Sequence, residues 1–532
     1  MNSTVEKCDI AIIGSGIGAL ACASFIAQLY PLKVVVVEQH SQPGGLSQEF
    51  VNIRKVSFEI GIHQVGELHS TSMFSKLMDF ISRGESVWRK LPDTFIKFHF
   101  PDFVYEVSAG EANQTGRLCT LFPDEKDNIL SYYKDIEIIT HWYRNFTTES
   151  IANDHDRLRE LLASEAGKLA MMTTREYLEY RFEDPKLRSL IGCHWTDYGL
   201  PPSLSAFLKH AILVNNHKEG VYYPEFGSKQ LIDSIAQSIK DNGGEFKLNS
   251  MVKEIKYTGN RASSVTILNK VSLAETHLEA DIFISGIGVV NTYTKLFDEK
   301  LGGERLKTLR DFKSYGISFV QLLATLKHDP TSLGADASLS WVFPGYDHEQ
   351  NFANRNQLNS ELISQFSISF PSLKKTSTGQ HSMKINTLVD YTVFQQWDLT
   401  SEEQDDYLIV KNKIARTLLD AAEKLYPGIG DNIESWDLYT PLSVKKDTQH
   451  HNGQIFGIPD TPARYRDLNF NCFTPLENVY VTGSDITSSG IYPAVLSGAI
   501  TTMAVFKDKT FFLKIIKAAG KYKFSKNDRS HG

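Results

Sequence analysis

The chain has 532 residues, is 41% hydrophobic and 22% charged, and carries a net charge of −7. This length exceeds what one simple core holds, so we expect two domains, which can interleave. The acidic balance argues against nucleic acid as the main partner. No run approaches ~18 uninterrupted apolar residues, and no basic flank with an apolar stretch opens the chain. We therefore expect neither a membrane-spanning helix nor a secretory signal.

The cysteines and histidines indicate neither disulfides nor metal. The five cysteines are scattered, and none forms a C-x-x-C pair. This usage is typical of a reducing compartment and of a protein without structural zinc. The 16 histidines show no ligand spacing with cysteine or carboxylates, so no metal site is predicted. We expect a cytoplasmic protein, with peripheral membrane contact left open.

The first 38 residues read as strand, glycine turn, helix, strand and acid. The strand runs are Ile10–Ile13 and Val34–Val37, with Gly14-Ser15-Gly16-Ile17-Gly18-Ala19 between them and Glu38 at the end. An ordinary glycine turn is the alternative interpretation. The strand before, the helix after and the acid at the expected distance favour a site for an adenine dinucleotide.

The residue types fit that site physically. Gly14 lets the chain turn off the strand, Gly16 lets a pyrophosphate approach the backbone, and Ala19 lets the helix pack on the sheet. The start of the helix offers free N–H groups and a positive dipole end to phosphates. Glu38 can accept hydrogen bonds from ribose hydroxyls and would repel a 2′-phosphate.

A second glycine pair follows the acid. Pro43-Gly44-Gly45 lets the backbone pass close to a ligand. A plain turn would explain this pair if it stood alone. Together with the first fingerprint it predicts a second contact with the same cofactor.

The rest of the chain alternates between nucleotide-type segments and other material. Helices are predicted over 158–170, 174–182, 230–241, 402–425 and 492–506, and strands over 95–107, 245–248, 251–257, 264–268, 281–286, 319–326, 367–370, 384–389 and 478–481. Nucleotide-type signals stand at the start, middle and end, which predicts interleaved domains.

A further glycine pattern, Ser285-Gly286-Ile287-Gly288, is predicted not to bind a second nucleotide. Its third small position is occupied by Asn291, and no strand that ends in an acid follows at the right distance. The electron donor or acceptor of the protein is left open by this prediction.

Several motifs together resemble one family of flavoproteins. The opening fingerprint, Pro43-Gly44-Gly45, Gly61-Ile62-His63-Gln64-Val65-Gly66 and the C-terminal Gly483-Ser484-Asp485 look like the phytoene desaturase, carotenoid isomerase and retinol saturase family. This family is part of the amine-oxidase-like FAD superfamily. Further matches are Asp197-Tyr198-Gly199-Leu200-Pro201-Pro202, Tyr222-Tyr223-Pro224 and Tyr439-Thr440-Pro441. The Gly-Ile-His and Asp-Tyr-Gly-Leu-Pro-Pro stretches favour the retinol saturase branch.

The resemblance implies an α/β fold in which a Rossmann-like FAD-binding domain is interleaved with an α+β substrate-binding domain. FAD is the implied cofactor. The expected segments are 1–70, 220–300 and 446–506 for the FAD-binding domain, 71–219 (mainly helical) and 301–445 (mixed sheet) for the substrate domain, and 507–532 as a basic tail.

The resemblance also implies a set of site residues. His63 is the candidate catalytic residue, as a proton donor to one end of a double bond. The plainer role for it, a hydrogen bond to backbone or flavin, is favoured. The implied cofactor-binding residues are Gly14, Ser15, Gly16, Ile17, Gly18, Ala19, Glu38, Gln39, Gly44, Gly45, Leu46, His63, Met251, Val252, Gly286, Gly483, Asp485 and Tyr492.

The expected reaction is reduction of a carbon–carbon double bond in a lipophilic polyene or isoprenoid, like retinol 13,14-saturation. Desaturation or isomerisation of a carotenoid is the second interpretation. An amine oxidase and a non-enzymatic prenyl-binding carrier stay open as other classes.

The basic tail after residue 506 has eight Lys or Arg and two Asp, with apolar residues interleaved. It predicts either contact with an anionic membrane surface or a solvated terminus.

Overall fold

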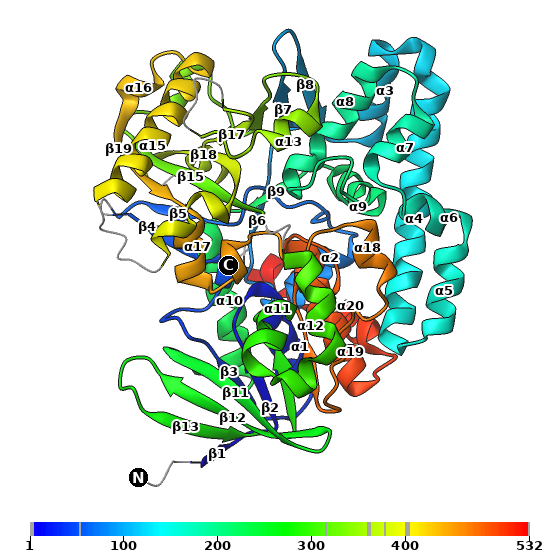
Figure 1. Ribbon diagram of the computed structural model, residues 1–532, viewed down its shortest axis with the longest axis vertical. Helices are drawn as coiled ribbons and strands as arrows, with labels where there is room; N and C mark the ends of the chain where they lie inside the picture. The colour runs from blue at the N-terminus through cyan, green and yellow to red at the C-terminus, as the bar shows by residue number, and fades with distance from the viewer. Residues whose placement is uncertain are drawn as a thin grey trace.

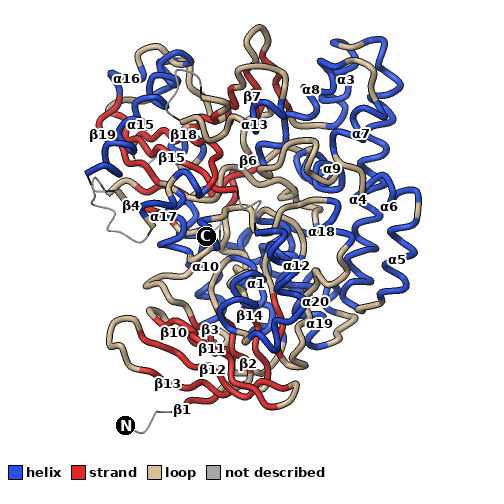
Figure 2. Tube along the Cα trace, in the orientation of Figure 1, coloured by secondary structure: helices blue, strands red, loops and turns tan. Residues whose placement is uncertain are grey.

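The computed structural model describes residues 5–52, 55–313, 317–358, 363–376, 379–398 and 405–529. A parallel sheet and a smaller, mostly antiparallel sheet lie at one end of the molecule, and a larger mixed sheet lies at the other (Figures 1 and 2). A helical wall flanks the larger sheet. This arrangement confirms the predicted α/β class with interleaved nucleotide and substrate segments, while the domain boundaries stay a prediction.

The parallel sheet unites segments from the start, middle and end of the chain. Its order is β10-β3-β2-β14-β20, and all of its neighbouring strands run parallel. Residues of β2 and β3 are buried on both faces, as expected for a covered parallel sheet. The strands are β2 (Ile10–Ile13), β3 (Val34–Val37), β10 (Glu245–Lys247), β14 (Ile282–Ser285) and β20 (Val479–Val481).

Alternation along β2 and β3 divides their side chains between two cores. Ile10 and Ile12 pack with the helices α1 (Ile17–Leu29) and α19 (Ile491–Phe506), whereas Ala11 and Ile13 pack toward the smaller sheet. That sheet has the order β1-β13-β12-β11. Its strands are β1 (Val5–Lys7), β11 (Ser250–Thr258), β12 (Arg261–Asn269) and β13 (Glu275–Glu279). Two short antiparallel pairs stand apart from it: β4 (Glu49–Val51) with β5 (Ser57–Glu59), and β6 (Trp88–Lys90) with β9 (Tyr222–Pro224).

The larger sheet has the order β19-β15-β18-β17-β16-β7-β8, and it is antiparallel except where β16 meets β7. Two of its strands, β7 and β8, come from the segment predicted to be mainly helical. The sheet therefore joins both parts of the predicted substrate domain. Its strands are β7 (Thr94–His99), β8 (Val104–Ser108), β15 (Ile317–Leu326), β16 (Leu339–Val342), β17 (Phe366–Ser369), β18 (His381–Asp390) and β19 (Ile433–Tyr439).

One predicted helix is wrong: the run 158–170 forms two helices that meet at Ser164. The Ser164 Oγ accepts a hydrogen bond from the Gly167 backbone N–H at 3.1 Å, so it caps a new helix. The helices of this wall are α3 (Glu111–Leu121), α4 (Lys126–Ala152), α5 (His155–Ala163), α6 (Glu165–Ala170), α7 (Thr174–Arg181), α8 (Pro185–Gly192) and α9 (Phe207–His217). The helix α2 (Met73–Ile81) lies outside the wall and packs against α1 and α19.

The basic tail is largely a docked helix. Phe511 and Ile515 are buried, and the Phe511 ring meets Phe25 edge to face at 5.2 Å, so the solvated alternative is wrong for these turns. No helix among the described residues has the length and hydropathy to span a bilayer. The remaining helices are α10 (Gly227–Asp241), α11 (Val289–Asn291), α12 (Glu299–Lys313), α13 (His348–Ala353), α14 (Pro371–Lys374), α15 (Asp405–Leu425), α16 (Ile429–Asn432), α17 (Pro441–Thr448), α18 (Pro462–Arg466) and α20 (Phe511–Arg529).

The predicted helix over 402–425 corresponds to α15, and residues 402–404 lie outside the described residues.

Candidate functional site

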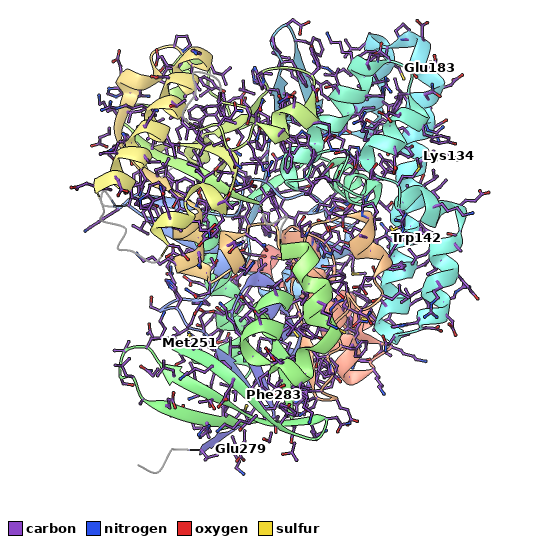
Figure 3. All side chains as sticks on the ribbon, viewed as in Figure 1. Lys134, Trp142, Glu183, Met251, Glu279 and Phe283 are labelled. Atoms are coloured by element: carbon purple, nitrogen blue, oxygen red, sulfur yellow. The ribbon has the colours of Figure 1, made fainter. Side chains whose placement is uncertain are left out.

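A cavity of about 460 Å³ runs from the parallel sheet to the larger mixed sheet. The structure brings every predicted cofactor-binding residue to its lining. Met251, near the start of β11 (Figure 3), reaches it from the smaller sheet. The predicted residues that line it are Gly14, Ser15, Gly16, Ile17, Gly18, Ala19, Glu38, Gln39, Gly44, Gly45, Leu46, His63, Met251, Val252, Gly286, Gly483, Asp485 and Tyr492.

The turn after β2 presents bare backbone to the cavity. Gly14 has φ +88°, and Gly16 is the N-cap residue of α1, which has neither a side-chain cap nor an acidic residue in its first turn. A Cβ placed on Gly16 would meet no protein atom within 4 Å. The free N–H groups of the helix start therefore face open space, which fits a phosphate.

Glu38 is fixed beside this turn. Its Oε2 accepts hydrogen bonds from the Ser15 backbone N–H at 2.9 Å and from the Ser15 Oγ at 2.5 Å. Its Oε1 accepts from the His40 backbone N–H at 2.8 Å. A carboxylate has about four lone-pair positions, so capacity is left for the hydroxyls of a ribose.

The second glycine pair lies against the first turn. The Gly44 backbone N–H donates to the Ser15 carbonyl at 3.0 Å. A Cβ on Gly45 would come within 3.1 Å of the Gly16 Cα. Two backbone turns thus meet without intervening side chains, and the predicted second contact with the cofactor stays a prediction.

Asp485 ties three distant segments together at the cavity wall. Its Oδ2 accepts from the Val289 N–H at 2.8 Å, and its Oδ1 accepts from the Ile458 N–H at 2.9 Å. Val289 follows the glycine pattern at Ser285, and the helix that it begins, α11, has only three residues. The segment belongs to the wall of this same cavity, and the strand before it, β14, lies in the parallel sheet.

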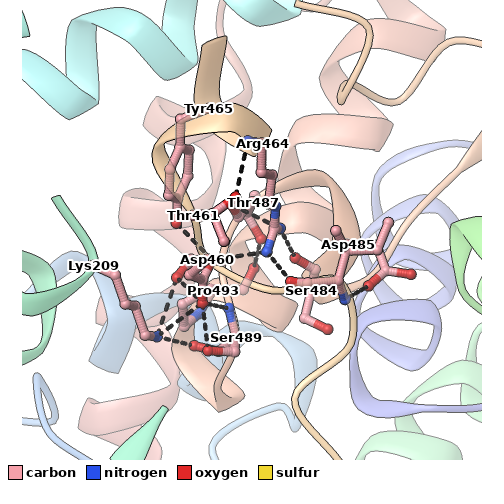
Figure 4. Close-up of polar contacts among 12 residues, drawn as sticks. Lys209, Asp460, Thr461, Arg464, Tyr465, Ser484, Asp485, Thr487, Ser489 and Pro493 are labelled. Atoms are coloured by element: carbon pink, nitrogen blue, oxygen red, sulfur yellow. Dashed lines mark hydrogen bonds and ion pairs between the residues drawn. The ribbon is translucent and has the colours of Figure 1, made fainter. Parts of the chain in front are cut away.

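A buried ionic network supports the start of α19 (Figure 4). The Lys209 Nζ donates to the Ser489 carbonyl at 2.6 Å and lies 3.7 Å from Asp460 Oδ2. The Arg464 guanidinium donates to Asp460 Oδ1 at 2.7 Å. Burial alone would raise the pKa of Asp460, but Arg464 and Lys209 hold it below its ordinary value. The Lys209 ammonium is thereby held at the cavity wall, against Ser489. The next residue, Gly490, is the N-cap residue of α19, which has no side-chain cap.

The sequence analysis missed Lys209. Residues of α9 at helical spacing line the cavity along one face of that helix, and Lys209 is a charged residue in this otherwise buried face. A lysine in an apolar helical stripe was the available signal. The lining residues of α9 are Lys209, Ile212, Leu213, Asn216 and His217.

Across the cavity from α9, the wall is formed by the mixed sheet. Alternate residues of β15, β16, β17 and β18 face the cavity, and most of them are apolar: Phe319, Leu339, Trp341, Ser367, Asn386 and Leu388. Apolar walls that carry few polar groups are typical of sites for lipophilic small molecules. We call the space between α9 and this sheet the sheet compartment.

His63 also lines the cavity, on a segment held by buried lysines. The Lys374 Nζ donates to the His63 carbonyl at 3.1 Å, and the Lys384 Nζ donates to the Glu59 carbonyl at 2.7 Å. Burial, then the charges of Lys384 and Lys374, lower the pKa of His63 well below its ordinary value. Its imidazole is therefore neutral and is not a cationic acid, although it can still donate one hydrogen bond.

Comparison with known proteins gives the family. The sequence pattern of the family described as flavin containing amine oxidoreductase matches residues 20–505. The chain is 25% identical to all-trans-retinol 13,14-reductase of Danio rerio, over 98% of this chain and 90% of that protein. It is 23% identical to the chloroplastic prolycopene isomerase of Arabidopsis thaliana, over 94% of this chain and 80% of that protein.

Among solved structures, an oxidoreductase from Methanosarcina mazei shares the fold. Its TM-score is 0.60 at 13% identity, over 94% of this chain and 100% of that chain. The bare turns, the acid and the two uncapped helix starts fit FAD, which is the cofactor that the family match supports. The chain belongs to the flavin-containing amine oxidoreductase family and is an FAD-dependent oxidoreductase.

Proposed function

We propose that this protein reduces a carbon–carbon double bond of a lipophilic polyene, in the manner of its retinol 13,14-reductase relatives. One observation carries the proposal: the cavity is continuous from the bare glycine turns to the apolar sheet compartment. A long apolar substrate can therefore lie against a flavin without leaving the protein.

The proposed roles of the residues follow from their chemistry. FAD, when bound, supplies the hydride chemistry. Glu38, Gly16 and the start of α1 hold its ADP half, and Met251 and Val252 contact the adenine side. Lys209 and the start of α19 stabilise negative charge at the flavin end. His63 donates a hydrogen bond as a neutral imidazole, and the apolar walls exclude water.

The test is an anaerobic single turnover. The holoprotein is reduced chemically, mixed with all-trans-retinol, and followed by flavin absorption and product mass. We expect flavin reoxidation and a product heavier by two hydrogens. A failure of every polyene tested to reoxidise the flavin would overturn the proposal.

The second candidate, desaturation or isomerisation, is favoured by the prolycopene isomerase relative. It predicts loss of two hydrogens from substrate with oxidised flavin, or an isomer of unchanged mass. Turnover of amines with release of peroxide would instead indicate an amine oxidase, and a purified protein without bound flavin would indicate a carrier.

We also propose peripheral membrane contact through α20. Phe511 and Ile515 face the protein, whereas Leu513 is 68% exposed and Ile516 is 39% exposed, beside Lys514 and Lys517. Exposed apolar residues among cations suit an anionic bilayer surface.

Co-sedimentation with vesicles that contain phosphatidylserine tests this contact. The double variant L513Q/I516Q should bind about tenfold less, while L130Q, a change at an exposed leucine of α4, should bind like the wild type. Equal binding by all three proteins would contradict it.

A further inference from the structure

A row of polar side chains crosses the floor of the sheet compartment. Gln321 on β15 stands opposite Asn386 on β18, Asn386 stands opposite Ser367 on β17, and Ser367 stands opposite Trp341 on β16. Residues directly opposite on neighbouring strands project from the same face of a sheet. Of this row, Asn386, Ser367 and Trp341 line the cavity.

The row crosses an apolar surface. Two positions along the same strands, Phe319, Leu388 and Leu339 lie on the same face and also line the cavity. A polar row placed among these residues, in a compartment otherwise suited to hydrocarbon, calls for a polar partner.

Along the row, each side chain donates a hydrogen bond to the next, from Gln321 to Asn386 and from Asn386 to Ser367. The Gln321 Nε2 donates to the Ile60 carbonyl at 3.2 Å and to Asn386 Oδ1 at 2.6 Å. These contacts fix the Asn386 amide, whose Nδ2 donates to Ser367 Oγ at 3.1 Å. The hydroxyl hydrogen of Ser367 is left to donate, and no acceptor for it is found among the described residues.

A second unused donor lies on the neighbouring strand, at the position opposite Ser367. The Trp341 Nε1 is buried and has no hydrogen-bond partner within the described part of the chain, and the side chain is only 5% exposed. An indole N–H can only donate. Ser367 is 1% exposed, so bulk water does not satisfy either group easily.

We propose that Ser367 and Trp341 bind an oxygen atom of the substrate. The two donors lie on neighbouring strands and line the cavity, whereas the unpaired acceptor of this row, Gln321 Oε1, lies outside the lining. Such a pair of donors matches an oxygen that accepts two hydrogen bonds: a hydroxyl, an aldehyde or a carboxylate. The substrate is then an oxygenated isoprenoid and not a plain hydrocarbon carotene. This inference rests on the proposed function, and Gln321 and Asn386 serve as positioning residues.

The test is equilibrium binding to the oxidised holoprotein, followed by the flavin absorption spectrum. The ligands are all-trans-retinol, retinal, retinoic acid and the deoxy hydrocarbon that lacks only the oxygen. We expect the wild type to bind at least one oxygenated ligand about tenfold more tightly than the hydrocarbon, as for one or two neutral hydrogen bonds. The order among the three identifies the oxygen chemistry.

Variants then locate the effect. S367A and W341F should each weaken binding of the oxygenated ligand about five- to tenfold and leave hydrocarbon affinity unchanged, and S367T should restore the preference. The matched control is S340A, because Ser340 lies beside Trp341 on the opposite face and contacts His99 Nε2 at 3.3 Å.

Three outcomes would overturn the inference. Equal affinity of the wild type for oxygenated ligand and hydrocarbon would refute it while leaving the proposed function intact, and so would variants that weaken both ligands equally. If no polyene of either kind binds, the proposed function fails and the inference fails with it. Melting temperatures of all variants separate these results from loss of the fold.

Discussion

The two ends of the cavity are built from different materials. The end at the parallel sheet is made of backbone: glycine turns, helix starts and one acid whose spacing is set within the first 45 residues. The end at the mixed sheet is made of side chains from α9 and four strands. A site made of backbone needs glycine at fixed positions, so it can be recognised in the sequence as a motif. A site made of side chains depends on the register of distant strands, so the sequence contains no such motif for it.

Among the changes considered, substitution in the buried ionic network between the two ends should lower the stability of the protein most. Asp460 is the counter-ion of both Lys209 on α9 and Arg464. D460N would leave two buried cations without a partner, and we expect it to cost about 3–5 kcal/mol in the free energy of unfolding. Urea denaturation of the holoprotein measures this loss.

The matched control for D460N is D156N. Asp156 pairs with Arg159 on α5, where the two side chains are 93% and 64% exposed. Removal of such a pair should change stability by less than about 1 kcal/mol. Similar losses in the free energy of unfolding for D460N and D156N would contradict a stabilising role of the buried network.

Acid should weaken the side-chain end before the backbone end. Burial lowers the pKa of His217, which lines the cavity on α9, and of His348, which packs against Phe343 next to the mixed sheet, from 6.5 to about 4. Since the folded pKa lies below that of the unfolded chain, the full stability is present above about pH 6.5 and is lost as the pH falls toward 4. Each histidine should account for about 3 kcal/mol of that loss.

Hydrogen exchange and urea denaturation at several pH values test this. H348Q should flatten the pH dependence by roughly the share of one histidine, whereas H328Q, at an exposed histidine, should not. Exchange that rises first in the parallel sheet would contradict the expected order.

At the backbone end, a single methyl group should separate cofactor binding from folding. Because an added Cβ on Gly16 meets no protein atom within 4 Å, G16A should fold with unchanged stability as the apoprotein. It should lose FAD affinity by about tenfold or more, since the methyl occupies the expected phosphate position.

The comparison for G16A is G18A, at a glycine two positions along. A Cβ there would lie 2.8 Å from the Ala494 carbonyl, so this change should destabilise the apoprotein itself. If G16A kept normal FAD affinity, the cofactor placement would be wrong.

The difference between the two ends of the cavity also decides which site residues could be predicted from the sequence. Gly16 and Glu38 could be predicted as site residues because each lies in a local pattern next to a strand end, whereas Asp485 was predicted from the family resemblance. Lys209 could not, since its role arises from contacts with Ser489 and Asp460, which are distant in the chain.

The mixed sheet shows the same limit for whole elements. The parallel pairing of β16 with β7 joins segments about 240 positions apart, and no short-range pattern encodes that register. The division of the 158–170 run into α5 and α6 was missed because one capping serine outweighed a continuous amphipathic pattern.

The central claim is that one cavity holds FAD at its backbone end and a polyene at its side-chain end. Its most direct test is titration of the oxidised holoprotein with all-trans-retinol, read by flavin absorption, in the wild type and in L388W. Leu388 lines the sheet compartment, so the larger ring should fill that space. Exposed Leu130 gives the control L130W.

We predict a saturable change in the flavin spectrum of the wild type and of L130W. L388W should retain its full FAD content and show no such change. Retinol binding that leaves the wild-type flavin spectrum untouched, or an L388W protein that responds like the wild type, would contradict the account.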